Sequence, residues 1–70
     1  MKIIANNYEA KDILKIIRQW TELTQNEYAK TLNKSKANIQ SYELGRNKIS
    51  LNQLLEIAKI HNLIITIEKR

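Results

Sequence analysis

The sequence contains no cysteine and no proline, and it has only one glycine and one histidine among its 70 residues. The lack of cysteine excludes disulfide bonds and thiolate metal sites, and one histidine cannot form a zinc site by itself. A domain of this size folds with little margin and then depends on helix packing or self-association. We therefore expect one domain, residues 1–70, with no metal and no cofactor.

Long apolar runs are also missing. The longest, Leu63-Ile64-Ile65, is far too short to cross a bilayer, and the first residues lack the apolar stretch of a signal peptide. One histidine, no cysteine and no glycine-rich phosphate loop leave no convincing nucleophile–base pair. We expect a cytoplasmic protein that is not an enzyme, has no catalytic residues and does not bind membranes.

What the sequence does have is positive charge. The formal net charge is +5 and the isoelectric point is near 9.7. Five basic residues face one acidic residue between positions 30 and 48, which gives this stretch a charge of +4. Such a cluster suits a polyanion such as nucleic acid, although a solvated surface has the same composition.

Two amphipathic helices are predicted in the first half of the chain. Apolar residues recur at helical spacing over residues 8–20, where Asn7 is a candidate N-cap. Thr24 and Glu27 have the spacing of a capping box, in which each residue bonds the other's backbone N–H. This spacing predicts a second helix over residues 25–32.

A short connection leads to a third helix. Asn33 tolerates the left-handed conformation that ends a helix, and Ser35 can cap a helix over residues 36–44 that Gly45 ends. Because only about three residues join the two helices, the chain must turn sharply between them. This pattern is typical of a helix-turn-helix.

The C-terminal third predicts a fourth helix and a strand. Ser50 and Gln53 form a second capping box before a helix over residues 51–61, and Asn62 is a suitable stop. Beyond it, β-branched and alternating residues predict a strand over residues 63–68. The fold class is therefore all-α, with four helices and one short C-terminal β-strand.

A single strand needs a pairing partner. Both faces of this one are apolar, which is unusual for an exposed edge. We expect it to pair with the same strand of a second copy and give a two-fold dimer. The predicted dimer interface consists of Leu63, Ile64, Ile65, Thr66 and Ile67. Pairing with residues 2–5 of the same chain is the alternative.

The third helix has a narrow apolar side. On a helical wheel only Ile39 and Tyr42 fall firmly on the core side. The opposite side carries short or hydrogen-bonding residues, namely Lys36, Ala37, Gln40 and Ser41, together with Leu44. Lysine can donate to guanine, glutamine can pair with adenine, and an alanine methyl can contact a thymine methyl. Because any half-exposed amphipathic helix has a similar wheel, the pattern alone does not establish base contacts.

The spacing of several residues strengthens the DNA interpretation. Leu23-Thr24-Gln25, Ala29, Ile39, Tyr42-Glu43 and Gly45 resemble the helix-turn-helix of the phage Cro and repressor family, also called the XRE family. The resemblance extends over about residues 13–60, with Asn33 and Glu22 standing where the family usually has glycine. It implies a lambda-repressor-like domain that regulates transcription, as a repressor, by binding double-stranded DNA. A dimer would place helix 36–44 in the major groove of a palindromic operator.

The resemblance also implies roles for individual residues. Base contacts would come from Gln25, Lys36, Ala37, Gln40 and Ser41. Phosphate contacts would come from Thr24, Lys34, Ser35, Arg46, Asn47 and Lys48. Arg18 and Glu43 match the family's buried ion pair, which is structural and would give Arg18 the partner that burial requires.

The C-terminal end resembles the HipB-type antitoxins, in which a short strand joins two subunits. This implies an alternative function, an antitoxin of a type II toxin–antitoxin module that binds a toxin and represses its own operon. A third possibility, a protein-interaction module with little affinity for DNA, fits the basic stretch poorly. A DNA-binding protein of this kind would be associated with the nucleoid, and so short a chain implies no small-molecule effector.

Overall fold

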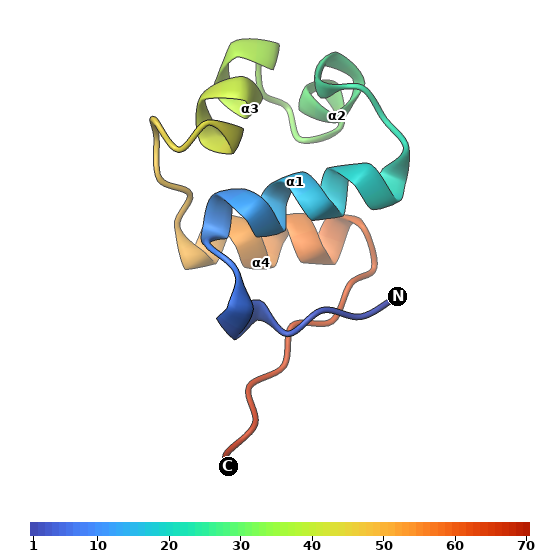
Figure 1. The fold of residues 1–70 in the computed structure, drawn as a ribbon. Coiled ribbons are helices and arrows are strands. Elements are labelled where there is room, and N and C mark those ends of the chain that lie inside the picture. The colour runs from blue at the N-terminus through green and yellow to red at the C-terminus, as the bar shows by residue number, and fades with distance from the viewer.

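Four α-helices and one short 3-10 helix make up the structure, a computed structural model that describes residues 1–70 (Figure 1). In chain order the elements are η1 (Ala5–Asn7), α1 (Ala10–Thr21), α2 (Gln25–Thr31), α3 (Lys36–Glu43) and α4 (Leu51–Ile60). The prediction of an all-helical fold is confirmed. Each α-helix begins and ends within two residues of its predicted limits.

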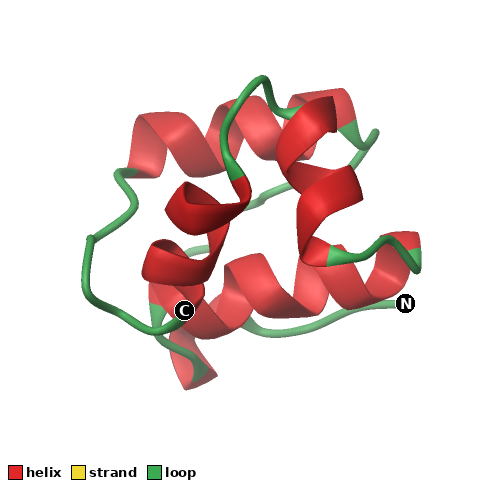
Figure 2. Cartoon of the chain, turned by 90° about the horizontal axis from the view of Figure 1, so that it is seen from above, coloured by secondary structure: helices red, strands yellow, loops and turns green.

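The helices form two groups around α1. α4 lies along one side of α1, whereas α2 and α3 lie on the other side (Figure 1). α3 packs against both α1 and α2. The N-terminal arm (residues 1–4) and the C-terminal tail (residues 63–70) lie at the end of the molecule away from α2 and α3 (Figure 1). The view from above in Figure 2 therefore looks onto α2 and α3.

The hydrophobic core takes side chains from all four α-helices. Its buried members are Leu14, Ile17, Tyr28, Ala29, Ile39, Leu54 and Ile57. Only 8 of the 70 residues are buried, so each core side chain supplies a large part of the stability. Truncation of a fully buried leucine such as Leu14 costs about 2–5 kcal/mol, against a total of about 5–15 kcal/mol for a small domain.

Side-chain caps begin three of the helices as the sequence predicts. The Thr24 hydroxyl accepts from the backbone N–H of Glu27 at 3.2 Å, and the Glu27 carboxylate accepts from the N–H of Thr24 at 3.0 Å. Ser50 caps α4 through the N–H of Gln53 at 3.1 Å, and Ser35 caps α3. These bonds satisfy N–H groups that have no partner within a helix.

The first helix begins later than expected. Asn7, the predicted N-cap, lies inside η1, and α1 starts at Ala10 after the N-cap Glu9. The backbone N–H of Glu9 donates to the Asp12 carboxylate at 3.3 Å. The prediction of Asn7 was wrong because the Asp12 side chain reaches back to the chain two residues further on.

Residues in the left-handed backbone conformation lie at the ends of the helices. The predicted stops Asn33, Gly45 and Asn62 have φ values of 57°, 78° and 56°. Glu22, at the C-cap of α1, also has a positive φ, of 61°. This conformation costs an ordinary L-residue about 1–2 kcal/mol. Glu22 therefore occupies a position that glycine would fill with less strain.

The predicted C-terminal strand is absent from the single chain. Leu63 donates its backbone N–H to Ala58 at 2.8 Å, and residues 64–70 then continue without a backbone hydrogen bond or strand pairing. Pairing with residues 2–5, the alternative, is not observed either, because this segment leads into η1 instead of a strand. A strand forms only when its backbone hydrogen-bonds to a neighbouring strand, so the alternating pattern of residues is not sufficient by itself.

A stacked aromatic pair lies at the C-terminal end of α4. The rings of Tyr28 and His61 are parallel within 8°, with centroids 5.3 Å apart. The buried Tyr28 Oη and His61 Nε2 atoms have no hydrogen-bond partner. Burial lowers the pKa of His61 and raises the pKa of Tyr28, because each charged form loses its hydration.

Candidate nucleic-acid interface

The turn between α2 and α3 is fixed by its backbone. Asn33 donates to the Lys30 carbonyl at 3.1 Å, and Lys34 donates to the Ala29 carbonyl at 2.8 Å. With Asn33 in the left-handed region, these bonds end α2 and redirect the chain at once. α3 therefore leaves α2 at a steep angle (Figure 2), as the sequence predicted for a helix-turn-helix.

α3 is buried on one side only. Ile39 is fully buried in the core, and Tyr42 is half-buried and accepts a hydrogen bond from Gln53 on α4 at 3.2 Å. Of the four α3 residues predicted to touch bases, three are exposed and Ser41 is half-buried. We call these four residues of α3 the reading face: Lys36, Ala37, Gln40 and Ser41. None of them packs in the core.

A partly buried ion pair fixes the orientation of α3 on α1. Arg18 donates to both carboxylate oxygens of Glu43, at 2.7 and 2.9 Å. The side chains are only 17% and 5% exposed. Arg18 also donates to the Leu23 carbonyl, and the hydrogen bond to Glu43 raises the pKa of Arg18 still further above the physiological range. The pair acts as the sequence implied, as a structural clamp.

The residues around the start of α2 are partly occupied within the chain. Gln25 is half-buried, and its side-chain amide donates to Glu43 at 3.3 Å. The hydroxyls of Thr24 and Ser35 serve as helix caps. Ser35 also donates to the Asn38 side chain at 2.6 Å. Of these predicted contact residues, Thr24 and Ser35 are exposed and stand at helix N-termini, where anions are favoured.

Basic residues lie at both ends of α3. Lys34 and Lys36 stand at its start, and the loop after it (residues 44–49, the basic loop) carries exposed Arg46, Asn47 and Lys48. The N–H groups of Arg46 and Asn47 donate to the Ser41 carbonyl at 3.0 and 3.4 Å, which holds the loop against the last turn of the helix. The reading face therefore lies between two positive regions.

The sequence analysis missed two features near α3. Asn38 is part of the cap of α3, a role that its position three residues after Ser35 could have suggested. Lys11 lies beside Gly45 although the two are far apart in the sequence. No local pattern predicts such a contact, because it depends on how α1 packs against the end of α3.

A sharply turned helix pair, with an exposed polar helix between basic residues, defines the class of helix-turn-helix DNA-binding proteins. A family model described as Helix-turn-helix matches residues 14–63, which is more than half of the chain. The chain belongs to this family, the Cro and C1-repressor (XRE) type, and is a DNA-binding regulator. No curated protein and no solved structure matches it significantly.

Two further properties concern other kinds of site. None of the helices combines the length and the apolar character needed to span a membrane. Likewise, no three histidine, cysteine, aspartate or glutamate side chains come together in an arrangement that could hold a metal ion. The chemistry visible around α3 is that of hydrogen-bond donors, acceptors and positive charge.

Proposed function

We propose that the protein is a sequence-specific transcriptional repressor that reads double-stranded DNA with α3 in the major groove. The observation that carries this proposal is the position of the reading face. Its residues are exposed or half-exposed, while Ile39 holds the opposite side of α3 in the core. A helix held in this way can enter a groove without any change in the domain's packing.

Each residue of the reading face has a base edge that suits it. Lys36 can donate to O6 and N7 of guanine, and Gln40 can pair with N6 and N7 of adenine. Ala37 can contact a thymine methyl group, and Ser41 can donate or accept. Gln25 keeps an amide oxygen that no hydrogen bond in the chain uses, so it can still accept from a base at the edge of the site.

The flanking residues would supply most of the affinity. Lys34, Arg46 and Lys48 carry positive charges on either side of the reading face, while Thr24, Ser35 and Asn47 can donate to phosphate oxygens. Phosphate contacts position a protein on DNA without choosing a sequence, and their strength falls as salt rises. This division of labour predicts different effects for base-contacting and phosphate-contacting variants.

We further propose that the repressor acts as a homodimer joined through the tail. Ile64 and Ile67 are 85% and 95% exposed, and the backbone of residues 64–70 has no hydrogen-bond partner. Antiparallel pairing about a two-fold axis at Ile65 would bring Ile67 of each copy beside Leu63 of the other. Since Leu63 packs against the core, the exposed isoleucine would gain an apolar neighbour.

The place of the tail suits such a dimer. It leaves the domain at the end away from α2 and α3, so pairing there keeps both reading faces free (Figure 1). Two copies related by a two-fold axis match a palindromic operator, with half-sites about one helical turn apart. The protein would then act in the cytoplasm, at the nucleoid.

A second candidate function is that of an antitoxin. The arm and the tail border an apolar groove of about 940 Å³, which also contacts Trp20 of α1. An exposed apolar groove of this kind can take a partner protein, and a toxin would be such a partner. Binding of a co-encoded toxin to the groove, with the operator complex retained, would favour this function over simple repression.

Selection of binding sites from random duplex DNA tests the main proposal. The purified protein is incubated with the library at fixed salt, because affinity for DNA has no meaning without it. We expect an inverted repeat whose half-sites lie about one helical turn apart. Enrichment of no sequence above the starting library would contradict sequence-specific binding.

A further inference from the structure

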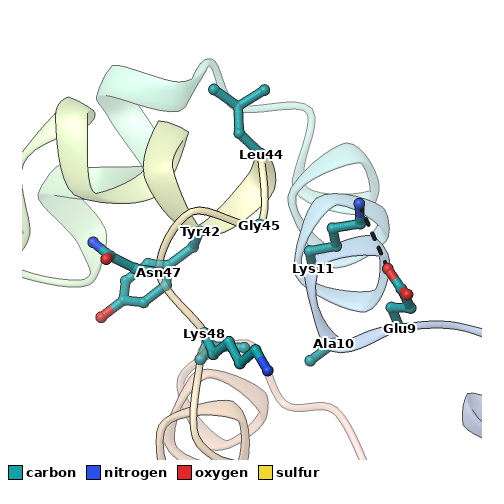
Figure 3. Close-up of a pocket in the computed structure, with 9 residues that line it drawn as sticks. Glu9, Ala10, Lys11, Tyr42, Leu44, Gly45, Asn47 and Lys48 are labelled. Atoms are coloured by element: carbon teal, nitrogen blue, oxygen red, sulfur yellow. Dashed lines mark ion pairs between the residues drawn. The ribbon is translucent and has the colours of Figure 1, made fainter.

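A cavity lies beside α3 that the sequence did not assign to any function. It occupies about 530 Å³ between the start of α1 and the basic loop. In Figure 3, Lys11 lies on the α1 side of this space and Lys48 on the side of the basic loop, while the side chain of Asn47 points away from Lys11. It therefore adjoins the residues proposed for phosphate contacts, but it adds a wall that comes from a different helix.

The position of Lys11 depends on Gly45. A side-chain Cβ at Gly45 would lie 3.1 Å from Lys11 Cδ, closer than an ordinary contact, so the lysine stem runs directly beside the end of α3. The φ of +78° favours glycine at this position as well. In Figure 3 the stem of Lys11 passes beside Gly45 and its ammonium group is directed toward Glu9, with the side chain 41% exposed.

The charges around the cavity favour an anion. The residues that line it include two lysines, Lys11 and Lys48, and a single acidic residue, Glu9. Glu9 lies 3.5 Å from Lys11, and its side chain is 73% exposed. A surface ion pair of this kind contributes little to stability, so an incoming anion can replace Glu9 at small cost.

We infer that this cavity holds a phosphate group of the DNA backbone, with Lys11 and Lys48 as its two cationic ligands. The inference rests on the proposed function and extends it, because it adds α1 to the elements that contact DNA. A duplex that lies on α3 and the basic loop would bring its phosphates past Lys48, and Lys11 lines the same cavity. Lys11 exchanges Glu9 for the phosphate when DNA binds.

Lys11 also has a purely structural interpretation. A cation near the C-terminus of α3 stabilises that helix through its dipole. Loss of this effect would lower the unfolding temperature but would leave the salt dependence of DNA binding unchanged. The number of phosphate contacts determines the slope of log affinity against log salt, so the slope separates the two roles.

The test compares three variants on the full chain: Lys11→Gln, Glu9→Gln and, as a control with the same loss of charge, Lys2→Gln. Lys2 belongs to the arm, away from α3 (Figure 1). Dissociation constants are measured for the selected site and for a random duplex between about 50 and 200 mM salt. A parallel arm measures whether inorganic phosphate alone raises the unfolding temperature.

We expect Lys11→Gln to reduce the salt slope by about 0.9, which is a three- to four-fold change across that range, equally on both duplexes. Glu9→Gln should bind both duplexes more tightly. A Lys11→Gln slope equal to that of Lys2→Gln would overturn the phosphate site alone. Free phosphate could also stabilise the wild type while Lys11→Gln keeps the wild-type salt slope for DNA binding. That result would overturn the assignment of the cavity to a DNA phosphate too. A wild type that bound no DNA would overturn both this site and the proposed function.

Discussion

The helix-turn-helix unit and the tail differ in whether their polar groups and apolar side chains find partners within the single chain. Around α3, the Ser35 cap and the Arg18–Glu43 pair give polar groups partners within the chain, and the left-handed Asn33 fixes the turn. In the tail, the isoleucines are exposed and the backbone amides have no partner. The first region is thus ready to bind a ligand, whereas the second has the composition of a surface that another chain covers.

Breaking the clamp on α3 should have the largest effect. Arg18→Ala leaves the Glu43 carboxylate buried without its cation, and we expect a loss of about 3–5 kcal/mol of unfolding free energy, measured by urea denaturation. Lys15→Ala, on the exposed side of the same helix, is the control and should change stability little. Equal effects of the two substitutions would contradict a clamp at α3.

Removal of the tail should come next. Deletion of residues 63–70 should give a monomer by light scattering and weaken binding to the palindromic site by about 100-fold, because the two half-sites are no longer engaged together. Deletion of residues 68–70 alone keeps the isoleucines and should leave the dimer intact. A dimer that survived the longer deletion would show that another surface joins the copies.

Relief of strain at the end of α1 should have a moderate effect. Glu22→Gly places glycine at a φ of 61° and should stabilise the domain by about 0.5–1 kcal/mol, measured as a higher urea midpoint. Asn33→Gly should gain less, because asparagine tolerates this conformation better than glutamate. If Glu22→Gly destabilised the domain, the strain at this position would be offset by a side-chain contact.

The smallest effect concerns pH. Burial lowers the pKa of His61, so the unfolded chain takes up a proton more readily than the folded one. The contribution of neutral His61 is complete above about pH 6.5 and is lost as the pH falls through its lower folded value. Hydrogen bonds from Thr24 lower the pKa of Glu27, whose contribution is therefore lost only at still more acid pH.

Urea denaturation at pH 7.5 and 5.5 measures this effect. We expect wild type to lose more stability between the two values than His61→Phe, which keeps a ring on Tyr28 but cannot be protonated. Identical losses in both proteins would show that His61 does not sense pH in this range.

Local signals explain most of what the sequence predicted correctly. Thr24, Ser35 and Ser50 mark helix starts through hydrogen bonds to residues only three positions away. These starts can therefore be recognised from the sequence alone. The tail failed as a strand because a strand depends on a partner that the chain does not contain. Lys11 was missed because its contact with Gly45 arises only when α1 packs on α3.

The central claim is that α3 reads bases while the basic loop holds phosphates. The most direct test measures binding of Gln40→Ala and Lys48→Ala to the selected site and to versions of it with single base-pair changes. We predict that Gln40→Ala loses discrimination at one base pair, worth about 1–3 kcal/mol, while Lys48→Ala weakens all sites equally. Unchanged discrimination in Gln40→Ala, and likewise in Lys36→Ala, would show that this face of α3 does not read the sequence.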